Sequence, residues 1–173
     1  MRIVAGRWRG RRIEAPPGSA VRPTLDRVRE AWMSIVQRDL PGARIVDLFA
    51  GSGALGLEAL SRGAEYADFV ERDARSIRVL QHNITELGAS ESSAIRRTDA
   101  IKYATNLGRA EYDVAFADPP YETGLASELA HIWLKTPFAT ILSVEHSRNV
   151  PMPEGGDTRR YGTTAITFYR SGD

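Results

Sequence analysis

The residues with the most chemical meaning are Asp118-Pro119-Pro120-Tyr121, which directly follow a short apolar stretch, residues 112–117. Two consecutive prolines fix the backbone and remove two N–H donors, so the carbonyl groups around them are held in place. Asp118 and the carbonyl of Pro119 can each accept a hydrogen bond from one amino group. Tyr121 offers an aromatic face on which a base that has left its helix can stack. The tetrapeptide is therefore a candidate catalytic site for chemistry on an exocyclic amine.

Such an amine needs help to react, because its lone pair is delocalised into the ring of the base. Two acceptors on its N–H groups favour tetrahedral geometry and direct the lone pair outward, toward a methyl donor. A rigid turn after a buried strand, without any ligand, is the alternative interpretation of Asp118-Pro119-Pro120-Tyr121.

A second candidate site is the loop Gly51-Ser52-Gly53-Ala54-Leu55-Gly56, which matches the pattern G-x-G-x-x-G between an expected strand and an expected helix. Glycines let the main chain approach a ligand closely, and the start of a helix offers free N–H groups. Glu71 lies 20 residues after Gly51, where a carboxylate can accept hydrogen bonds from both ribose hydroxyls. This loop alone predicts a nucleoside cofactor, NAD or S-adenosylmethionine, or else a turn that binds nothing.

Two further carboxylates favour S-adenosylmethionine. Asp47 precedes the loop, where it can reach a positively charged methionine amino group and would repel a pyrophosphate. Asp99 follows the third expected strand and can accept from the adenine amino group, although either acid could instead be a helix cap or a solvated charge. The predicted cofactor-binding residues are Asp47, Phe49, Gly51, Ser52, Gly53, Glu71, Arg72, Asp99 and Ala100.

Strands that alternate with helices must position these residues. A helix is expected from a Thr24 N-cap, with Asp26 in its first turn and an apolar face from Val28 to Val36. The remaining strands are expected at 45–49, 66–70, 93–97, 112–117, 140–144, 158–161 and 164–169, and the remaining helices at 53–62, 73–87, 101–107 and 125–134. This order predicts an α/β fold with a mostly parallel sheet, whose carboxyl edge brings the glycine loop and Asp118 together.

Length, composition and charge narrow the class of protein. The chain has 173 residues, which suits one domain, and it has no cysteine, which excludes disulfides and thiolate metal sites; no metal site is predicted. We find neither a secretory signal nor an apolar run long enough for a membrane helix, so a soluble cytoplasmic protein is expected. Residues 1–38 hold nine arginines against three acidic residues, whereas the remainder is acidic, and this asymmetry favours a polyanionic partner.

The basic N-terminus is expected to form a small hairpin from residues 2–5 and 11–13, with Gly6 and Gly10 bracketing its turn. Alternate residues of a strand share a face, so its arginines could follow phosphates, provided that strand geometry holds there. Trp8 could stack on an unpaired base or pack beneath the hairpin, and both roles stay open. The predicted RNA-binding residues are Arg7, Trp8, Arg9, Arg11, Arg22, Thr24 and Arg27.

These motifs resemble the Asp/Asn-Pro-Pro-aromatic amino-methyltransferases, and more narrowly the RsmD family, which methylates a guanine N2 of small-subunit (16S) ribosomal RNA. The stretches that carry the likeness are residues 2–10, 22–30, 47–56 and 117–121, with support from 144–147 and 160–164. The resemblance implies a Rossmann-like methyltransferase domain, residues 23–173, with a seven-stranded sheet and a reversed last strand. It implies an N-terminal extension, residues 1–22, that helps to hold RNA. It also implies that Gly51, Ser52 and Gly53 bear S-adenosylmethionine, Glu71 its ribose and Asp99 its adenine.

Other functions stay open at this point. The motifs alone do not separate guanine N2 from adenine N6 or cytosine N4, whereas methylation of pyrimidine carbon 5 through a cysteine nucleophile is excluded. An NAD-dependent oxidoreductase explains the glycine loop but leaves Asp118 to Tyr121 unused, and a non-catalytic RNA-binding assembly factor gives no reason for Asp118. The expected partner is ribosomal RNA or a partly assembled small ribosomal subunit, bound by a monomer.

Overall fold

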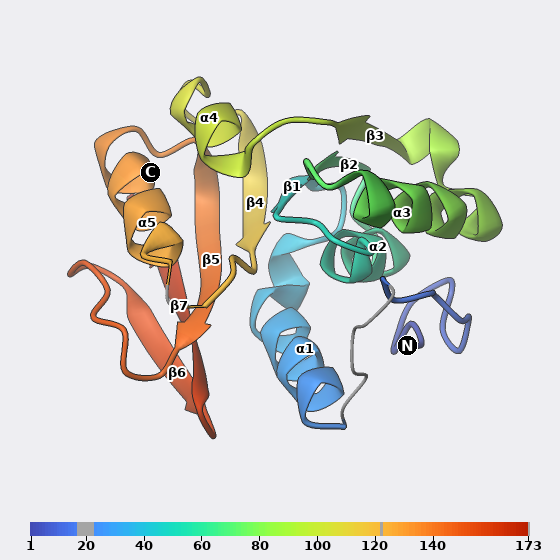
Figure 1. Ribbon diagram of the computed structural model, residues 1–173, viewed down its shortest axis with the longest axis horizontal. Helices are drawn as coiled ribbons and strands as arrows, with labels where there is room; N and C mark the ends of the chain where they lie inside the picture. Colours follow the sequence, from blue (N-terminus) through green and yellow to red (C-terminus); the bar gives the residue numbers. More distant parts are fainter. Residues whose placement is uncertain (17–22, 122, 173) are drawn as a thin grey trace.

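A seven-stranded sheet with helices on both faces forms the frame of the molecule (Figure 1). The computed structural model describes residues 1–16, 23–121 and 123–172. The strands lie in the order β3-β2-β1-β4-β5-β7-β6. Their bounds are β1 Arg44–Leu48, β2 Tyr66–Val70, β3 Ser93–Arg96, β4 Tyr112–Ala117, β5 Ala139–Ser147, β6 Asp157–Tyr161 and β7 Thr164–Arg170.

Five neighbouring strands, β1 to β5, pair in parallel, and β7 runs antiparallel to both β5 and β6. The α/β class, the seven strands and the reversed last strand predicted from the sequence are thereby confirmed. The reversed strand, although last in the chain, lies inside the sheet, and β6 forms the edge.

The helices divide between the two faces of the sheet. On one face, α1 (Pro23–Val36), α2 (Ala54–Ser61) and α3 (Ala74–Leu87) pack over a core that includes Trp32 and Phe116. On the other face, α4 (Ala100–Thr105) and α5 (Leu125–Lys135) pack over a second core that includes Trp133 and Tyr169. No helix within the described ranges is long and apolar enough to span a membrane.

Helix α1 begins two residues earlier than an N-cap at Thr24 implies. Thr24 was predicted as the N-cap, but Pro23 is already helical, so Thr24 lies within the first turn. Proline is favoured at the first position of a helix because its missing N–H has no partner there in any case. Arg22 and the side chain of Thr24 lie outside the described part of the structure, so their predicted RNA contacts stay predictions.

The N-terminal segment, residues 1–16, docks on α2 instead of standing free. Backbone N–H groups of Val4 and Ala5 donate to the carboxylate of Glu58, at 2.9 and 3.1 Å, and Glu58 itself is fully buried. The N–H of Trp8 donates to Oγ of Ser61 at 3.0 Å. Three apolar side chains of the segment, Ile3, Trp8 and Ile13, belong to the core beneath α1 to α3.

The predicted pair of strands is reduced to a single antiparallel bridge between Arg2 and Arg12. Residues 7–10 form a turn, so Arg7 and Arg9 do not line one face of a strand as anticipated. The prediction fails because the chain bends to meet α2: a β-carbon on Gly6 would stand 1.9 Å from the carbonyl oxygen of Ser61. Trp8 is only 8% exposed, which supports packing as its role and leaves no free face for a base.

Candidate functional site

The register of the parallel strands β1, β4 and β5 determines which residues lie next to Asp118, the candidate catalytic residue. Leu48 of β1 pairs with Ala117 of β4, which pairs with Val144 of β5. The residues that follow these three are Phe49, Asp118 and Glu145, so they stand side by side at the carboxyl edge of the sheet. Ligands bind at this edge in open parallel sheets.

Two cavities open at the same edge and share Phe49, Asp118 and Glu145. The larger cavity, about 920 Å³, runs from Glu71 and Asp99 past the Asp118-Pro119-Pro120-Tyr121 tetrapeptide to the β6–β7 turn. The smaller cavity, about 360 Å³, is lined by the glycine loop, Asp47 and Arg29. All of the predicted cofactor and catalytic residues except Gly53 line these two cavities, and Asp118 lies where the cavities meet.

Glu71 organises the glycine loop. One of its carboxylate oxygens accepts from the N–H of Gly51 at 2.8 Å, and the other accepts from the N–H groups of Arg72 and Asp73. Three backbone donors leave this carboxylate with limited capacity for a ribose hydroxyl. Phe49, at the start of the turn, adopts a positive φ of 59°, a costly conformation for a residue with a side chain.

The first and third residues of the loop face different surroundings. A β-carbon on Gly51 would meet no atom within 4 Å, and the residue lines the smaller cavity. A β-carbon on Gly53 would lie 2.4 Å from the Leu80 side chain, inside the core. We expected glycine at position 53 because the cofactor would lie against it, and this reason is wrong. Glycine is required there because residue 53 has a φ of 85° and packs against α3.

Asp47 is buried, with an exposed fraction of 1%, and one oxygen accepts from the N–H of Gly56 at 3.0 Å. Burial raises the pKa of Asp47 well above its ordinary value, and the nearby charges of Asp118 and Glu71 raise it further. A buried acid among other acids is ready to receive a cation. Because Asp47 also lines the smaller cavity, an ammonium group there could reach it.

Asp99 serves as the N-cap of α4, since its carboxylate accepts from the N–H of Lys102 at 2.9 Å. Its other oxygen lies 3.5 Å from the guanidinium of Arg72. The predicted residues Arg72, Asp99 and Ala100 are thus brought together at the wall of the larger cavity. The cap that the sequence left open as an alternative is present, and Asp99 keeps access to the cavity as well.

Asp118 and Glu145 form a carboxyl pair. Asp118 keeps solvent contact through the cavity, but protein surrounds its carboxyl otherwise, and this burial raises its pKa. Burial and the charge of Asp118 raise the pKa of Glu145 to about 9. Tyr121 Oη donates to Glu145 at 3.3 Å and also contacts the hydroxyl of Thr164. The predicted catalytic residues Asp118 and Tyr121 therefore converge on a carboxyl that sequence reasoning did not assign to the site.

Pro119 is buried and Pro120 is exposed, and both line the larger cavity, so the whole tetrapeptide is in place. Two functional candidates escaped the sequence analysis. Glu145 was noticed only as part of a family-like stretch, and the strand register was the signal that could have found it. Arg29 lies in the expected apolar helix, yet it is 7% exposed, and its Nε has no hydrogen-bond partner among the described residues.

We expect Gly53→Ala to lower protein stability more than Gly51→Ala. Both alanines must adopt a positive φ, 57° at residue 51 and 85° at residue 53, but the alanine at 53 must also displace Leu80, and this overpacking costs about 1–3 kcal/mol. The alanine at 51 meets no protein atom, so it should instead reduce cofactor affinity. Thermal unfolding and calorimetric titration with S-adenosylhomocysteine on both variants separate the two effects, and equal unfolding temperatures would contradict this division.

Comparisons with known proteins place the chain in a family. Residues 1–170 match the family described as "Conserved hypothetical protein 95". The ribosomal RNA small subunit methyltransferase D of Escherichia coli K12 is 37% identical, over 98% of this chain and 88% of that protein. The protein of the same description from Haemophilus influenzae is 34% identical, over 98% and 92%.

Solved structures agree with this placement. The Escherichia coli methyltransferase yhhF superposes with a TM-score of 0.84 at 32% identity, over 98% of this chain and 97% of that one. Thermus thermophilus RsmC, described as a 16S rRNA N2 G1207 methyltransferase in complex with AdoMet and guanosine, has a TM-score of 0.70 at 18% identity. This superposition covers 90% of this chain and 45% of RsmC, and it shows that the two proteins share a fold. The chain belongs to the RsmD family of S-adenosylmethionine-dependent ribosomal RNA methyltransferases.

Proposed function

We propose that this protein transfers a methyl group from S-adenosylmethionine to the N2 amine of a guanine in small-subunit ribosomal RNA. The observation that carries the proposal is the position of Asp118, at the junction of the two cavities and level with the glycine loop. Membership of the RsmD family supports the substrate. The acceptors at this junction support an amine as the group that reacts.

The two cavities match the two ends of the cofactor. The methionine end carries one positive and one negative charge, and the smaller cavity holds Asp47 for an ammonium and Arg29 for a carboxylate. The nucleoside end fits the larger cavity, where Glu71 and Asp99 supply acceptors. Gly51, whose side of the loop is open, would let the main chain approach the ligand.

When bound, the cofactor would supply a methyl group on a positively charged sulfur. The amine nitrogen would form the new N–C bond as the sulfur keeps the electron pair of the S–C bond, and the proton released from nitrogen would pass to Asp118 or to water. Asp118 and the carbonyl of Pro119 hold the two N–H groups of the amine and direct its lone pair. Asp118 also places negative charge where positive charge develops on nitrogen. Tyr121, 45% exposed, offers its ring to the base from the larger cavity.

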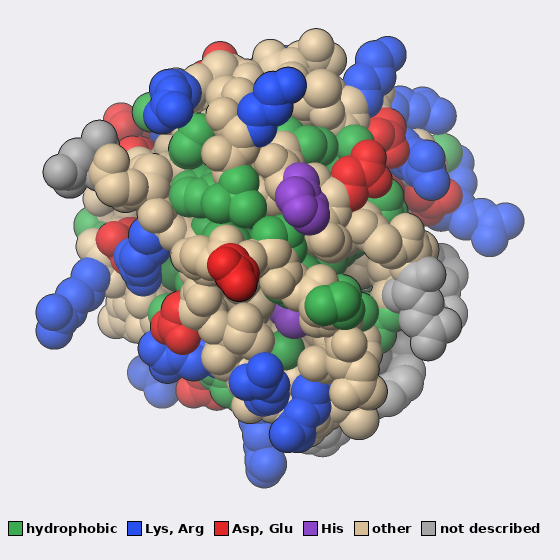
Figure 2. Space-filling view, turned by 90° about the vertical axis from the view of Figure 1, so that its left-hand side faces the viewer, with side chains coloured by type: hydrophobic (Ala, Val, Ile, Leu, Met, Phe, Trp, Pro, Cys, Tyr) green, Lys and Arg blue, Asp and Glu red, His purple; other side chains and the backbone are tan. Residues whose placement is uncertain are grey.

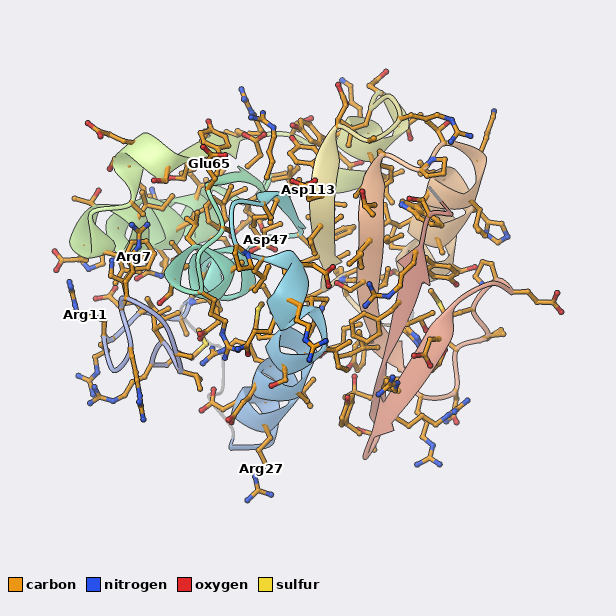
Figure 3. All side chains as sticks on the ribbon, turned by 180° about the vertical axis from the view of Figure 1, so that it is seen from behind. Arg7, Arg11, Arg27, Asp47, Glu65 and Asp113 are labelled. Atoms are coloured by element: carbon orange, nitrogen blue, oxygen red, sulfur yellow. The ribbon has the colours of Figure 1, made fainter. Side chains whose placement is uncertain are left out.

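RNA would reach this site across the basic N-terminal segment. Figure 3 shows Arg7 and Arg11 beside α2 and α3, and Arg27 pointing outward from the start of α1. Arg7 stacks over the ring of Trp8 at 4.2 Å, and Arg11 donates to the carbonyl of Glu86 at 2.7 Å. The guanidinium groups of Arg9 and Arg12 are exposed and carry much of the proposed phosphate contact. On the side that bears α5 and β6, Figure 2 shows basic and acidic side chains interspersed.

We expect Asp118→Ala to lower kcat by about 10²–10³ while S-adenosylhomocysteine affinity stays nearly unchanged, because the lost contact acts on the amine in the transition state. Single-turnover transfer of labelled methyl to small-subunit RNA or subunits measures the first quantity, and calorimetry the second. Near-normal transfer in this variant, with intact unfolding temperature, would rule out the role given to Asp118.

Arg29→Met should weaken S-adenosylhomocysteine binding by about tenfold or more, since a hydrogen bond to a charged group contributes about 1.5–3 kcal/mol. Binding of 5′-methylthioadenosine, which has the same nucleoside and no amino-acid end, should change little. Comparing both ligands by calorimetry cancels any general loosening of the site. An equal loss for the two ligands would mean that Arg29 supports α1 without contacting the cofactor.

The double variant Arg9→Gln with Arg12→Gln should bind RNA more weakly and show a flatter dependence of log affinity on log salt, by about 0.7–0.9 for each lost phosphate contact. Deleting residues 1–15 is a poorer test, because it removes buried Ile3 and Ile13. The matched control is Arg109→Gln with Lys135→Gln, two exposed cations that lie before the start of β4 and at the last residue of α5. The same salt slope for the test variant and wild type would place the RNA on another surface.

A further inference from the structure

We propose that Glu145 determines base specificity: it accepts the N1–H of the target guanine while Asp118 holds the neighbouring N2 amine. The inference rests on the proposed function, because it names the group that reads the base on which that function acts. It assigns a role to a residue outside both the glycine loop and the Asp-Pro-Pro-Tyr tetrapeptide.

The geometry puts the two carboxyls next to each other along the sheet edge. Glu145 follows Val144, the strand partner of Ala117, and Asp118 follows Ala117. Neighbouring strands lie about 4.8 Å apart. The amine N2 and the ring nitrogen N1 of guanine are held on one carbon atom, so their hydrogens point along the same edge of the base. Two carboxyls on adjacent parallel strands can therefore meet both.

Glu145 is fixed in this position. It is 8% exposed, it lines both cavities, and its Oε2 accepts from Tyr121 Oη. The hydroxyl of Thr164, which contacts the same Tyr121 hydroxyl, donates to the carbonyl of His146. The Tyr121 hydroxyl thus joins the ring offered to the base to the carboxyl that would read it, and Thr164 of β7, itself bonded to β5, contacts the same hydroxyl.

The hydrogen on the ring nitrogen separates guanine from the other candidate bases. In guanine, the ring nitrogen beside the exocyclic amine on the Watson–Crick edge carries a hydrogen and donates. In adenine and cytosine, the corresponding nitrogen carries none and accepts. A carboxylate beside Asp118 would accept a hydrogen bond from the N1–H of guanine. In adenine or cytosine the same carboxylate would face the lone pair of the ring nitrogen and be repelled by it. Enzymes that act on an extruded base read this edge by hydrogen bonds.

Electrostatics explains how such a pair persists without substrate. Two carboxylates this close repel each other, so at neutral pH they share a proton, in keeping with the raised pKa values of both. The N1–H and N2–H groups of a bound guanine would likewise reduce the repulsion between the two carboxylates, by donating to them from the cavity. Burying an ionisable group on a strand costs stability, and such groups concentrate at functional sites.

The experiment compares guanine with 2-aminopurine, which keeps the N2 amine but has no hydrogen on N1. Once the methylated nucleotide is mapped, RNA with either base at that position is presented, free or in reconstituted subunits, to wild type and Glu145→Gln. The wild type should prefer guanine by about 10²-fold or more, since a site built for a donor rejects an analogue without it. In the variant, whose amide can turn to donate or accept, the preference should fall at least tenfold.

The ratio of the two preferences isolates the contact, because any difference in intrinsic reactivity between the two amines is common to both proteins. Glu154→Gln, at an exposed glutamate between β5 and β6, is the matched control and should keep the wild-type preference. Unfolding temperature and S-adenosylhomocysteine affinity report whether the variant folds. Equal losses on both bases would give Glu145 a structural role and overturn the inference.

Failure of this inference is distinguishable from failure of the proposed function. If the wild type methylates adenine N6 or cytosine N4, the proposed guanine function is wrong whatever Glu145 does. If the wild type methylates guanine N2 and Glu145→Gln keeps its preference for guanine over 2-aminopurine, only the role of Glu145 is overturned.

Discussion

The parallel register of β1, β4 and β5 is the constraint on which the site depends. It sets Phe49, Asp118 and Glu145 level with one another, although they lie far apart in the chain. A shift of one residue in either pairing would turn a side chain from the cavity to the opposite face. The apolar residues before each of the three, Leu48, Ala117 and Val144, are fully buried, so packing against the helices holds this register.

The same edge concentrates acidic groups that carry a cost. Asp47, Asp118 and Glu145 lie in or beside the two cavities, and burial raises the pKa of each. Two ligands would offset this free-energy cost. The cofactor would bring a positively charged sulfur and an ammonium group, and the base would bring N–H donors. The site therefore has the opposite electrostatic sign from the arginine-rich segment that would receive the RNA backbone. Under the proposed function, phosphates and the reacting base would therefore be attracted to different groups of residues.

Much of the frame could be predicted from sequence because the strands are short apolar runs bounded by turn residues. The placement of the glycine loop and the tetrapeptide in one site then followed from the rule that ligands bind at the carboxyl edge of a parallel sheet. The role of Gly53 could not be predicted, since the pattern alone does not say which glycine faces a ligand and which faces Leu80. Glu145 needed the pairing of β4 with β5, and Trp8 needed the docking of the N-terminal segment on α2. Both depend on contacts between residues distant in the chain, which periodicity does not record.

Helix α2 links the surface proposed for RNA to the methyl-transfer site. It begins directly after Gly53, in the loop proposed to bind the cofactor, and toward its other end Glu58 and Ser61 hold the N-terminal segment. Arg29 makes a second link, since it lines the smaller cavity and donates to the carbonyl of Arg2 at 2.7 Å. Because protein interiors are closely packed, a short helix held at both ends keeps the groups at those ends at a nearly fixed distance from each other. Phosphates bound by the segment would therefore be fixed relative to the cofactor, and the target base would meet Asp118 at a set distance from its own backbone.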